Sequence, residues 1–305
     1  MRSFVLETMT RCLVFVGVVL SAAACAGAGP ASHPAAPPAA SPAPSPAAAP
    51  PQRATPAPGA DAIHLGPSLL RYLIERRVDI HQQVLGQESS SQLAYRVFAT
   101  SAIHGPSDTA GYPTTFTLDS IVPDSGTRLP GTINLASARG LTFTGVLRPN
   151  GEFHRATPSD STIAQGLEQL VGTFRDFYPH FPRSGLILGA SWTDTLSRTN
   201  RSGSIDKLLI TAITTSRAAA IVERNGAHSV QIESTSAITL SGNGALGGQP
   251  ITLQGSGSRH AVEFVAVDGR YLGSESLDST LITFTFPGQT VPQRLVSHAT
   301  VKVLP

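Results

Sequence analysis

The sequence is poor in several residue types on which common functional sites depend. Its 305 residues include two cysteines, one tryptophan and nine histidines, and only 14% are charged. Of the 22 basic residues only Lys207 and Lys302 are lysines, and no cluster of five or more basic residues occurs. Nucleic acid is therefore not an expected partner, because binding to its phosphates needs a concentrated basic patch.

Motifs that mark many enzymes are also absent. The chain has no G-x-S-x-G, H-E-x-x-H, C-x-x-C or G-x-x-x-x-G-K sequence. One partial match, Ser204-Ile205-Asp206-Lys207, is similar to the S-x-x-K pattern of penicillin-recognising serine enzymes. Their chemistry needs the serine and the lysine one helical turn apart, whereas Lys207 leads into a β-type run. We expect no catalytic residues, no metal and no cofactor.

The N-terminus has the pattern of an export signal. Arg2 and Arg11 flank an apolar run over residues 12–20, which is shorter than the roughly 20 residues needed to span a bilayer. Small residues follow at positions 21–24, and Cys25 comes next. This arrangement resembles the lipobox of bacterial lipoproteins, in which the cysteine receives a diacylglycerol and becomes the mature N-terminus.

The resemblance implies a signal peptide over residues 1–24 and lipidation of Cys25. It also implies that the membrane is a partner and that the protein lies in the cell envelope, at the outer membrane or the periplasmic face. Cys25 is the only cysteine of the mature chain that this cleavage would leave, so no internal disulfide is expected. The alternative is ordinary cleavage after Ala24, which would give a secreted soluble protein.

Residues 25–60 have the composition of a tether. Positions 26–60 contain 11 prolines and 14 alanines. Such a segment cannot bury enough apolar surface to repay the entropy of ordering it. Proline favours an extended conformation, so a reach on the order of 100 Å is expected. We therefore predict a disordered tether over 25–60 and a single β-rich globular domain over 61–305.

Within that domain most segments have the alternation of β-strands, and three dipeptides mark hairpin turns: Asn150-Gly151, Asn225-Gly226 and Asp268-Gly269. Residues 67–75 fit either a strand or a short helix, and the helix is favoured. Predicted strands cover residues 93–103, 114–121, 141–147, 152–155, 191–196, 208–215, 218–224, 228–240, 251–255, 261–267, 271–276, 280–286 and 295–303.

One long helix is predicted over residues 159–178. Pro158 and Asp160 provide start signals, and Pro179 and Pro182 end the pattern. The helix carries one apolar stripe, which needs an apolar partner, and the sheet is the largest one available. The predicted fold class is mainly β (α+β), with a curved antiparallel β-sheet or half-barrel meander packed on this main helix. The stripe consists of Ile163, Leu167, Leu170, Val171, Phe174 and Phe177.

Residues 177–192 resemble a motif of an uncharacterised group of bacterial lipoproteins and secreted proteins. Phe177-Tyr-Pro-His-Phe-Pro182 is the Pro-rich exit from a helix, and Leu186-Ile-Leu-Gly-Ala-Ser-Trp192 is the G-x-S-W element that precedes a β-meander. Ala190 stands where that group has Asp. More distantly, the signal, tether and helix-lined curved sheet resemble lipid-binding lipoproteins of the LolA/LppX type.

These resemblances lead us to expect a non-enzymatic envelope lipoprotein whose sheet binds a hydrophobic ligand or lipid. The predicted lining residues are Phe174, Phe177, Phe181 and Trp192. One alternative is a structural or assembly module that binds an envelope protein. A second is a hydrolase with an unrecognised site, which would need a Ser, Asp or Glu within hydrogen-bond reach of a His in a cleft.

Overall fold

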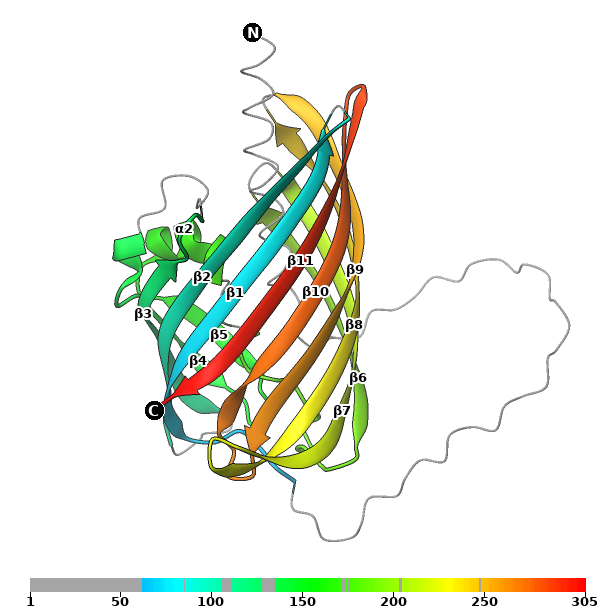
Figure 1. The fold of residues 1–305 in the computed structure, drawn as a ribbon. Helices are drawn as coiled ribbons and strands as arrows, with labels where there is room; N and C mark the ends of the chain where they lie inside the picture. The colour runs from blue at the N-terminus through cyan, green and yellow to red at the C-terminus, as the bar shows by residue number, and fades with distance from the viewer. Residues whose placement is uncertain are drawn as a thin grey trace, which may run out of the picture.

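The described residues form one antiparallel sheet of 11 strands (Figure 1). The computed structural model describes residues 62–84, 86–105, 111–127, 135–171, 174, 176–202, 205–246 and 248–305. The expectations for the signal peptide, the tether and Cys25 concern residues outside these ranges and stay predictions. The strands are β1 (Ser68–Val84), β2 (Gln87–Ile103), β3 (Tyr112–Pro123), β4 (Thr142–Leu147), β5 (Phe153–Pro158), β6 (Ser191–Ser202), β7 (Ile205–Arg224), β8 (Ala227–Leu246), β9 (Gln249–Ala266), β10 (Tyr271–Phe286) and β11 (Gln289–Leu304).

Two meanders make up the sheet. Its strand order is β5-β4-β3-β2-β1-β11-β10-β9-β8-β7-β6, so each neighbour is also a neighbour in sequence except at the junction of β1 with β11. The turn from β7 to β8 shows how the meander is built: Asn225 and Gly226 have φ values of 51° and 71°, as a two-residue type I′ turn requires. The predicted antiparallel meander is confirmed.

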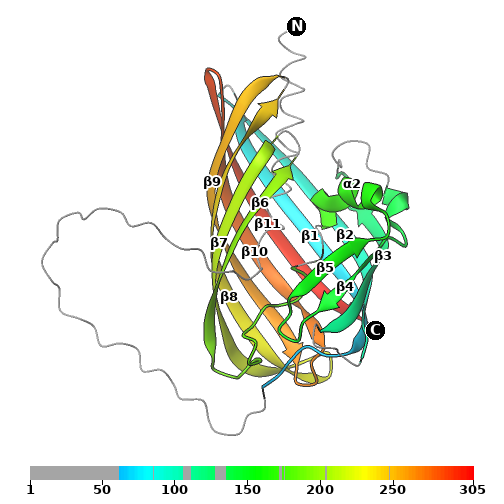
Figure 2. The same ribbon diagram turned by 180° about the vertical axis from the view of Figure 1, so that it is seen from behind.

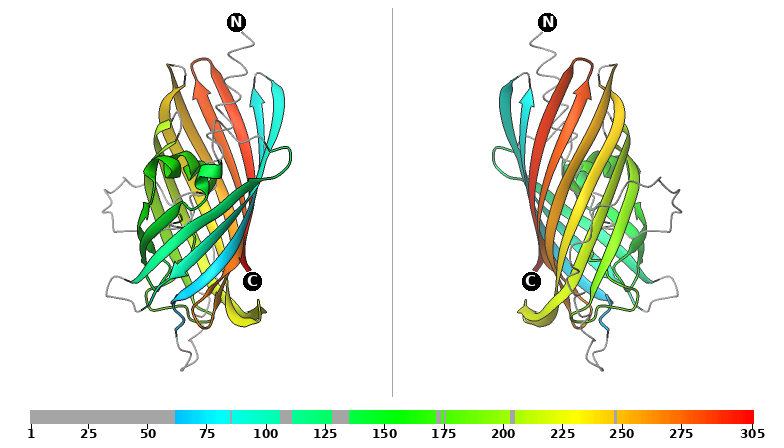
Figure 3. Two further views of the ribbon diagram at one scale, coloured as in Figure 1. Left: turned by 90° about the vertical axis from the view of Figure 1, so that its left-hand side faces the viewer. Right: turned by 90° about the vertical axis from the view of Figure 1, so that its right-hand side faces the viewer.

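The sheet is rolled but open, with β5 and β6 at its two edges (Figures 2 and 3). Its upper half in Figure 1 contains the β1–β2 and β10–β11 turns, and its lower half contains the β7–β8 turn. The short strand β4 pairs with β3 only from Tyr112 to Thr117, in the lower half. Among the described residues, β2 has no strand partner on its β3 side over residues 87–93. The upper half is therefore a curved sheet with two free edges, as the half-barrel prediction expected.

Helix α2 (Ser161–Val171) is shorter than predicted. Its start agrees with the sequence, because the backbone N–H groups of Thr162 and Ile163 both donate to Asp160 Oδ1 at 2.9 Å, which makes Asp160 the N-cap. The predicted end at residue 178 is wrong. Phe174 has a φ of 55°, which a right-handed helix cannot accommodate. Within the described part of the chain, no helix combines the length and apolarity needed to cross a bilayer.

The helix still packs on the inner face of the sheet, as expected. Leu167 and Leu170 are buried, and the Tyr95 hydroxyl of β2 donates to the Leu170 carbonyl at 2.5 Å. A 3₁₀ turn, η2 (Leu135–Ala138), lies between this helix and β3. Figure 2 shows α2 beside β2 and β3, at one edge of the interior.

Residues 67–75 are not helical, so that interpretation is wrong. They begin β1, which pairs along its length with β2 on one side and β11 on the other. Tyr72 points inward and is 1% exposed, whereas Leu69 points outward and is 72% exposed. The apolar residues here fit both the 3.6-residue period of a helix and the two-residue period of a strand. Hydrogen bonding to a neighbouring strand on each side stabilises the strand.

Three pairs of predicted strands are single long strands. Residues 208–215 and 218–224 both belong to β7, 251–255 and 261–267 to β9, and 271–276 and 280–286 to β10. The polar residues that lie in the gaps between the predicted strands include Ser216, Arg259 and Asp278. They do not interrupt the strands, because their side chains face the interior of the rolled sheet and find partners there.

Candidate ligand-binding interior

Aromatic rings fill the lower half of the interior. Phe174 stacks on Phe116 of β3 with ring centroids 3.9 Å apart, and it meets the edge of Phe143 of β4 at 5.1 Å. Phe174 and Phe177 are thus brought together, but as part of a packed core that continues into the upper half of the interior. A ligand contact by either ring stays a prediction. Phe177 contacts four further rings at centroid distances of 4.7–5.5 Å, namely Tyr72, Phe116, Tyr178 and Tyr271.

The other two predicted lining residues lie around the start of β6. Phe181 is 3% exposed, and its backbone N–H donates to the Asn150 carbonyl at 3.1 Å. The indole Nε1 of half-buried Trp192 donates to the His180 carbonyl at 3.2 Å. Through the backbone of Phe181 and the indole of Trp192, the segment after the helix is held in place, and for both residues a ligand contact stays a prediction.

A row of polar side chains crosses the inner face at mid-height. The strand register places one polar residue from each of six neighbouring strands opposite the next. Four members of the row are buried, with Asp278 6% and Ser297 1% exposed, and Arg259 and Asp194 are half-buried. The hydroxyls of Thr214 and Ser236 bond each other at 2.8 Å. This polar row consists of Ser297, Asp278, Arg259, Ser236, Thr214 and Asp194.

Charges within and beside the polar row are unevenly matched. Arg259 Nε lies 3.6 Å from Asp278 Oδ1. Burial raises the pKa of Asp278 and also that of Glu263, which lies on β9 next to the row, while Arg259 opposes both shifts. A buried carboxyl with a raised pKa is a weaker counter-ion, because it carries its negative charge only at higher pH.

Arg76 of β1 brings a second guanidinium to this region. It lies near enough to Asp278 to oppose the rise in the pKa of that carboxyl. It also opposes the rise that burial causes in the pKa of Tyr95. Its Nε and Nη2 atoms are buried and have no hydrogen-bond partner among the described residues. The hydroxyl of Ser297 is likewise buried and has no hydrogen-bond partner among the described residues.

At the β6 end of the polar row is a small enclosed cavity of about 10 Å³, lined in part by His180, Asp194 and Glu263. That volume accommodates one water molecule at most. Burial lowers the pKa of His180 and raises the pKa of Asp194. These groups could exchange a proton, but the cavity has no room for a substrate.

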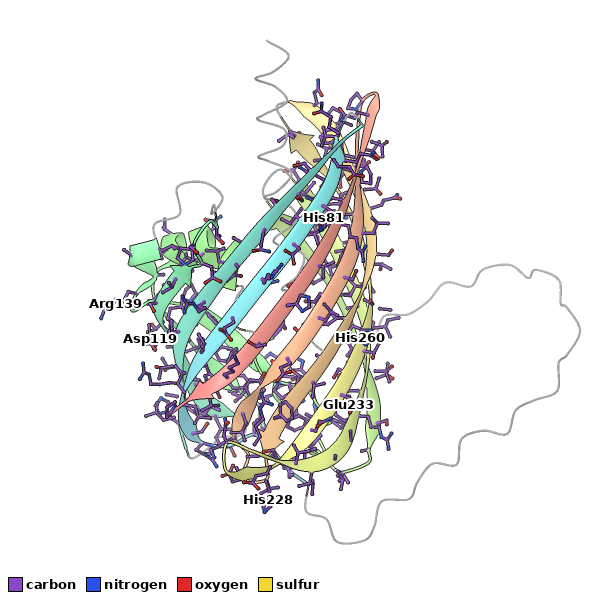
Figure 4. The ribbon with its side chains drawn as sticks, viewed as in Figure 1. His81, Asp119, Arg139, His228, Glu233 and His260 are labelled. Atoms are coloured by element: carbon purple, nitrogen blue, oxygen red, sulfur yellow. The ribbon has the colours of Figure 1, made fainter. Side chains whose placement is uncertain are left out.

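The strongest serine- or threonine-based candidate for catalysis is on the outer face. Thr235 Oγ1 lies 3.3 Å from His260 Nδ1, in a shallow hollow of about 710 Å³ that Glu233 also lines. Figure 4 shows Glu233 and His260 on the outside of the sheet, far from His81 and His228. Both β8 and β9 are paired on both sides, so their backbone N–H groups are used in the ladders and none remains to stabilise an oxyanion.

Within residues 62–305, the described side chains form no group of three or more His, Cys, Asp and Glu able to hold a metal ion. The imidazole of His154 instead bonds Glu152 Oε2 at 2.9 Å, and Arg148 bonds the same oxygen at 2.6 Å. This is a local ion-pair cluster around the β4–β5 turn.

Above the polar row the inner face is mainly apolar. Most of the inward side chains there are at most 8% exposed, and Leu246 is half-buried. Two buried glutamines interrupt them, with Gln293 Nε2 donating to Gln82 Oε1 at 3.5 Å. The apolar members are Ile80, Val84, Leu196, Leu208, Ile210, Ile238, Leu240, Ile251, Leu253, Ile282, Phe284, Phe286, Val291 and Leu295.

A separate apolar groove lies outside the sheet at its lower end. Its volume is about 460 Å³, and Ile63 and Leu186 contribute to its wall. Leu188 is 43% exposed, and Ile221 and Val267 are each 52% exposed. Large apolar side chains gathered on a surface in this way are typical of contact sites for other proteins.

No protein-family model and no curated protein matches the chain. Among solved structures, the crystal structure of Pseudomonas aeruginosa OccK2 (OpdF) is similar over 78% of this chain and 98% of that chain, with 9% sequence identity. The TM-score is 0.28, which is too low for the likeness to support an argument about fold or function.

The sequence analysis missed the polar row and Arg76. Their side chains are separated by up to 221 positions along the chain, and only the strand register brings them to one level. A signal was nevertheless present, because Arg259 and Asp278 fall at positions where the apolar alternation of otherwise continuous strands is broken.

Proposed function

We propose that the protein is a non-enzymatic envelope lipoprotein, anchored through Cys25, that holds a hydrophobic ligand or lipid against the inner face of its rolled sheet. The observation that supports this most is the apolar inner face of the upper half. In most domains a sheet face of this kind packs against a second layer of secondary structure. Here the described segments outside the sheet pack along β2, β3 and the lower half.

The free edges of the upper half support the same function. Residues 87–93 of β2 and the outer side of β6 have no strand partner among the described residues. A hydrophobic chain could therefore enter from the side, between these edges, without the breaking of a strand ladder. Sites for small molecules are usually concave, mainly apolar and equipped with a few polar groups, and the polar row provides such groups at the base of the upper half.

Native mass spectrometry tests the proposal. The full-length protein is purified from the envelope fraction in mild detergent, and its mass is compared with the mass after lipid extraction. We expect a non-covalent lipid adduct. In the Cys25→Ala variant the adduct should remain, because it does not depend on the covalent acyl chains. Absence of any adduct from both forms would contradict ligand binding.

The anchor is tested by the same variant. Two or more acyl chains hold a protein firmly at a bilayer, since each buried methylene contributes about 0.8 kcal/mol. Cys25→Ala should therefore move the protein from the membrane fraction to the soluble fraction. Unchanged fractionation would show that the thiol carries no anchor.

The outer apolar groove favours a second candidate function, the binding of another envelope protein. Ile221→Asp places a charge in this groove and should abolish co-purification of such a partner while leaving the lipid adduct intact. Ile213→Asp is the matched control, because Ile213 is 51% exposed on the same strand but does not line the groove. Equal effects of the two variants would rule out a specific contact in the groove.

A further inference from the structure

The guanidinium of Arg76 is only partly compensated within the described part of the chain, where it hydrogen-bonds the Tyr95 hydroxyl and lies near Asp278. Its Nε and Nη2 atoms are buried and have no hydrogen-bond partner among the described residues. Buried polar atoms nearly always have a partner, because burial removes their hydration. An unpartnered pair of charged N–H donors is therefore a sign that an acceptor belongs beside them.

A second donor lies on the neighbouring strand. In the register of β1 with β11, Arg76 is opposite Ala299 and Val78 is opposite Ser297, so Arg76 and Ser297 are diagonal neighbours on the same face. Ser297 is 1% exposed, and its hydroxyl has no hydrogen-bond partner in the described ranges. The two side chains together present N–H and O–H donors to one region of the interior.

The surrounding charges leave this region electropositive. Arg76 and Arg259 both act on Asp278, and Arg259 also acts on Glu263. Burial raises the pKa of Asp278 and of Glu263. Both shifts weaken the negative charge available to neutralise the arginines. An anion with several acceptor oxygens would meet the donors and the charge together.

Directly above this region is the apolar part of the inner face. Ile80 and Leu295 form the next inward-facing pair along β1 and β11 after Val78 and Ser297. Val84 is the last residue of β1. The eight residue-to-residue steps from Arg76 to Val84 extend about 27 Å along β1. That distance suits a long aliphatic chain. Below the region the aromatic cluster around Tyr72 and Phe177 closes the interior.

We propose that Arg76 and Ser297 bind the anionic head group of a single-chain amphiphile whose aliphatic tail lies along the apolar upper half of the sheet. This rests on the proposed lipid-binding function and specifies its ligand class, an oxyanion head on a long alkyl chain. Carboxylate and phosphate heads share this chemistry, because both present several oxygens to a guanidinium.

Three probes with the same alkyl chain test the proposal: palmitate, hexadecyl phosphate and hexadecanol. Each is titrated calorimetrically into delipidated full-length protein and into two variants. For the unmodified protein we expect at least one anion to bind about tenfold or more tightly than hexadecanol, because hydrogen bonds to a charged group are strong in an apolar site. The stronger anion identifies the head group.

The variants locate the effect. Arg76→Met keeps an unbranched side chain and removes the charge, and it should erase the preference for an anion while leaving hexadecanol binding unchanged. Arg77→Met is the matched control, because Arg77 lies on the outer face and pairs with Asp79 at 3.1 Å. It should keep the preference. Ser297→Ala, which removes only the hydroxyl, should weaken the preference and serves if Arg76→Met does not fold.

The outcomes separate this inference from the function on which it rests. Equal binding of all three probes by the unmodified protein would overturn the head-group assignment and leave lipid binding standing. A preference that survives in Arg76→Met and in Ser297→Ala would overturn it as well. Failure of every probe to bind, together with no lipid adduct from cells, would contradict the proposed function itself.

Discussion

A single glycine at the start of β10 is expected to be critical for stability. Gly273 has a φ of 104° and lies at a β-bulge in the pairing of β10 with β9. A Cβ atom added there would be 2.0 Å from the carbonyl oxygen of Val301 on β11. Gly273→Ala therefore combines backbone strain with a collision against the backbone of a neighbouring strand.

The size of the effect follows from these two terms. An L-residue at positive φ costs roughly 1–2 kcal/mol. Relief of the collision requires β10 and β11 to separate by about 1 Å, since such contacts are essentially never shorter than 3.0 Å. The separation weakens ladder hydrogen bonds that contribute about 1 kcal/mol each. We expect Gly273→Ala to lower the free energy of unfolding by about 3–5 kcal/mol.

Gly288→Ala provides a matched control. Gly288 has a φ of 77°, but nothing lies within 4 Å of the added Cβ. Gly288→Ala should lower the free energy of unfolding only by the cost of the backbone strain. In urea unfolding followed by the fluorescence of Trp192, the sole tryptophan, an m-value of about 3 kcal/mol/M gives midpoint shifts of about 1–1.7 M for Gly273→Ala and about 0.5 M for Gly288→Ala. Equal shifts for the two variants would refute the close approach of β10 to β11.

Three further changes test other parts of the fold. Phe116→Ala removes the ring on which Phe174 stacks and should lower the free energy of unfolding by about 3–5 kcal/mol; a loss below 1 kcal/mol in thermal or urea unfolding would contradict the packed lower core. Asn225→Val should cost about 1–2 kcal/mol, because a β-branched residue resists the positive φ of the turn, whereas Asn225→Gly should be nearly neutral in the same assay. Burial raises the pKa of Glu152, but hydrogen bonds from His154 and Arg148 outweigh burial and lower the pKa to about 2. The resulting stabilisation is complete above the ordinary pKa of about 4.3 and is lost as the pH falls towards 2, so Glu152→Gln should flatten the pH dependence of unfolding in that interval; an unchanged slope would show that the cluster contributes nothing.

Local signals in the sequence predicted local structure well. The three hairpin dipeptides lie at turns, and the glycine of each has a positive φ, which glycine adopts at little cost. Asp160 begins the helix for a similar reason, since an N-cap needs only its own side chain and the next three residues.

The errors arose where distant residues decide the structure. The helix was extended to residue 178 because Phe174 and Phe177 continue its apolar stripe, but packing of Phe174 against Phe116 of β3 turns the chain instead. Arg259 and Asp278 fall in gaps between the predicted strands, although they lie within β9 and β10 and face a partner across the sheet. The position of Arg76 beside Ser297 depends on the β1–β11 register, which no local pattern encodes.

The junction of β1 with β11 has a consequence for biogenesis. Contacts across it join residues such as Glu75 and Thr300, which are 225 positions apart. In the strand order the two meanders are joined only by this ladder. The edge of β1 that pairs with β11 therefore has no partner until β11, the last strand, is present. A chain crossing a membrane from its N-terminus would therefore be vulnerable to aggregation throughout its passage, and a chaperone that shields the edge of β1 would be most useful in that interval.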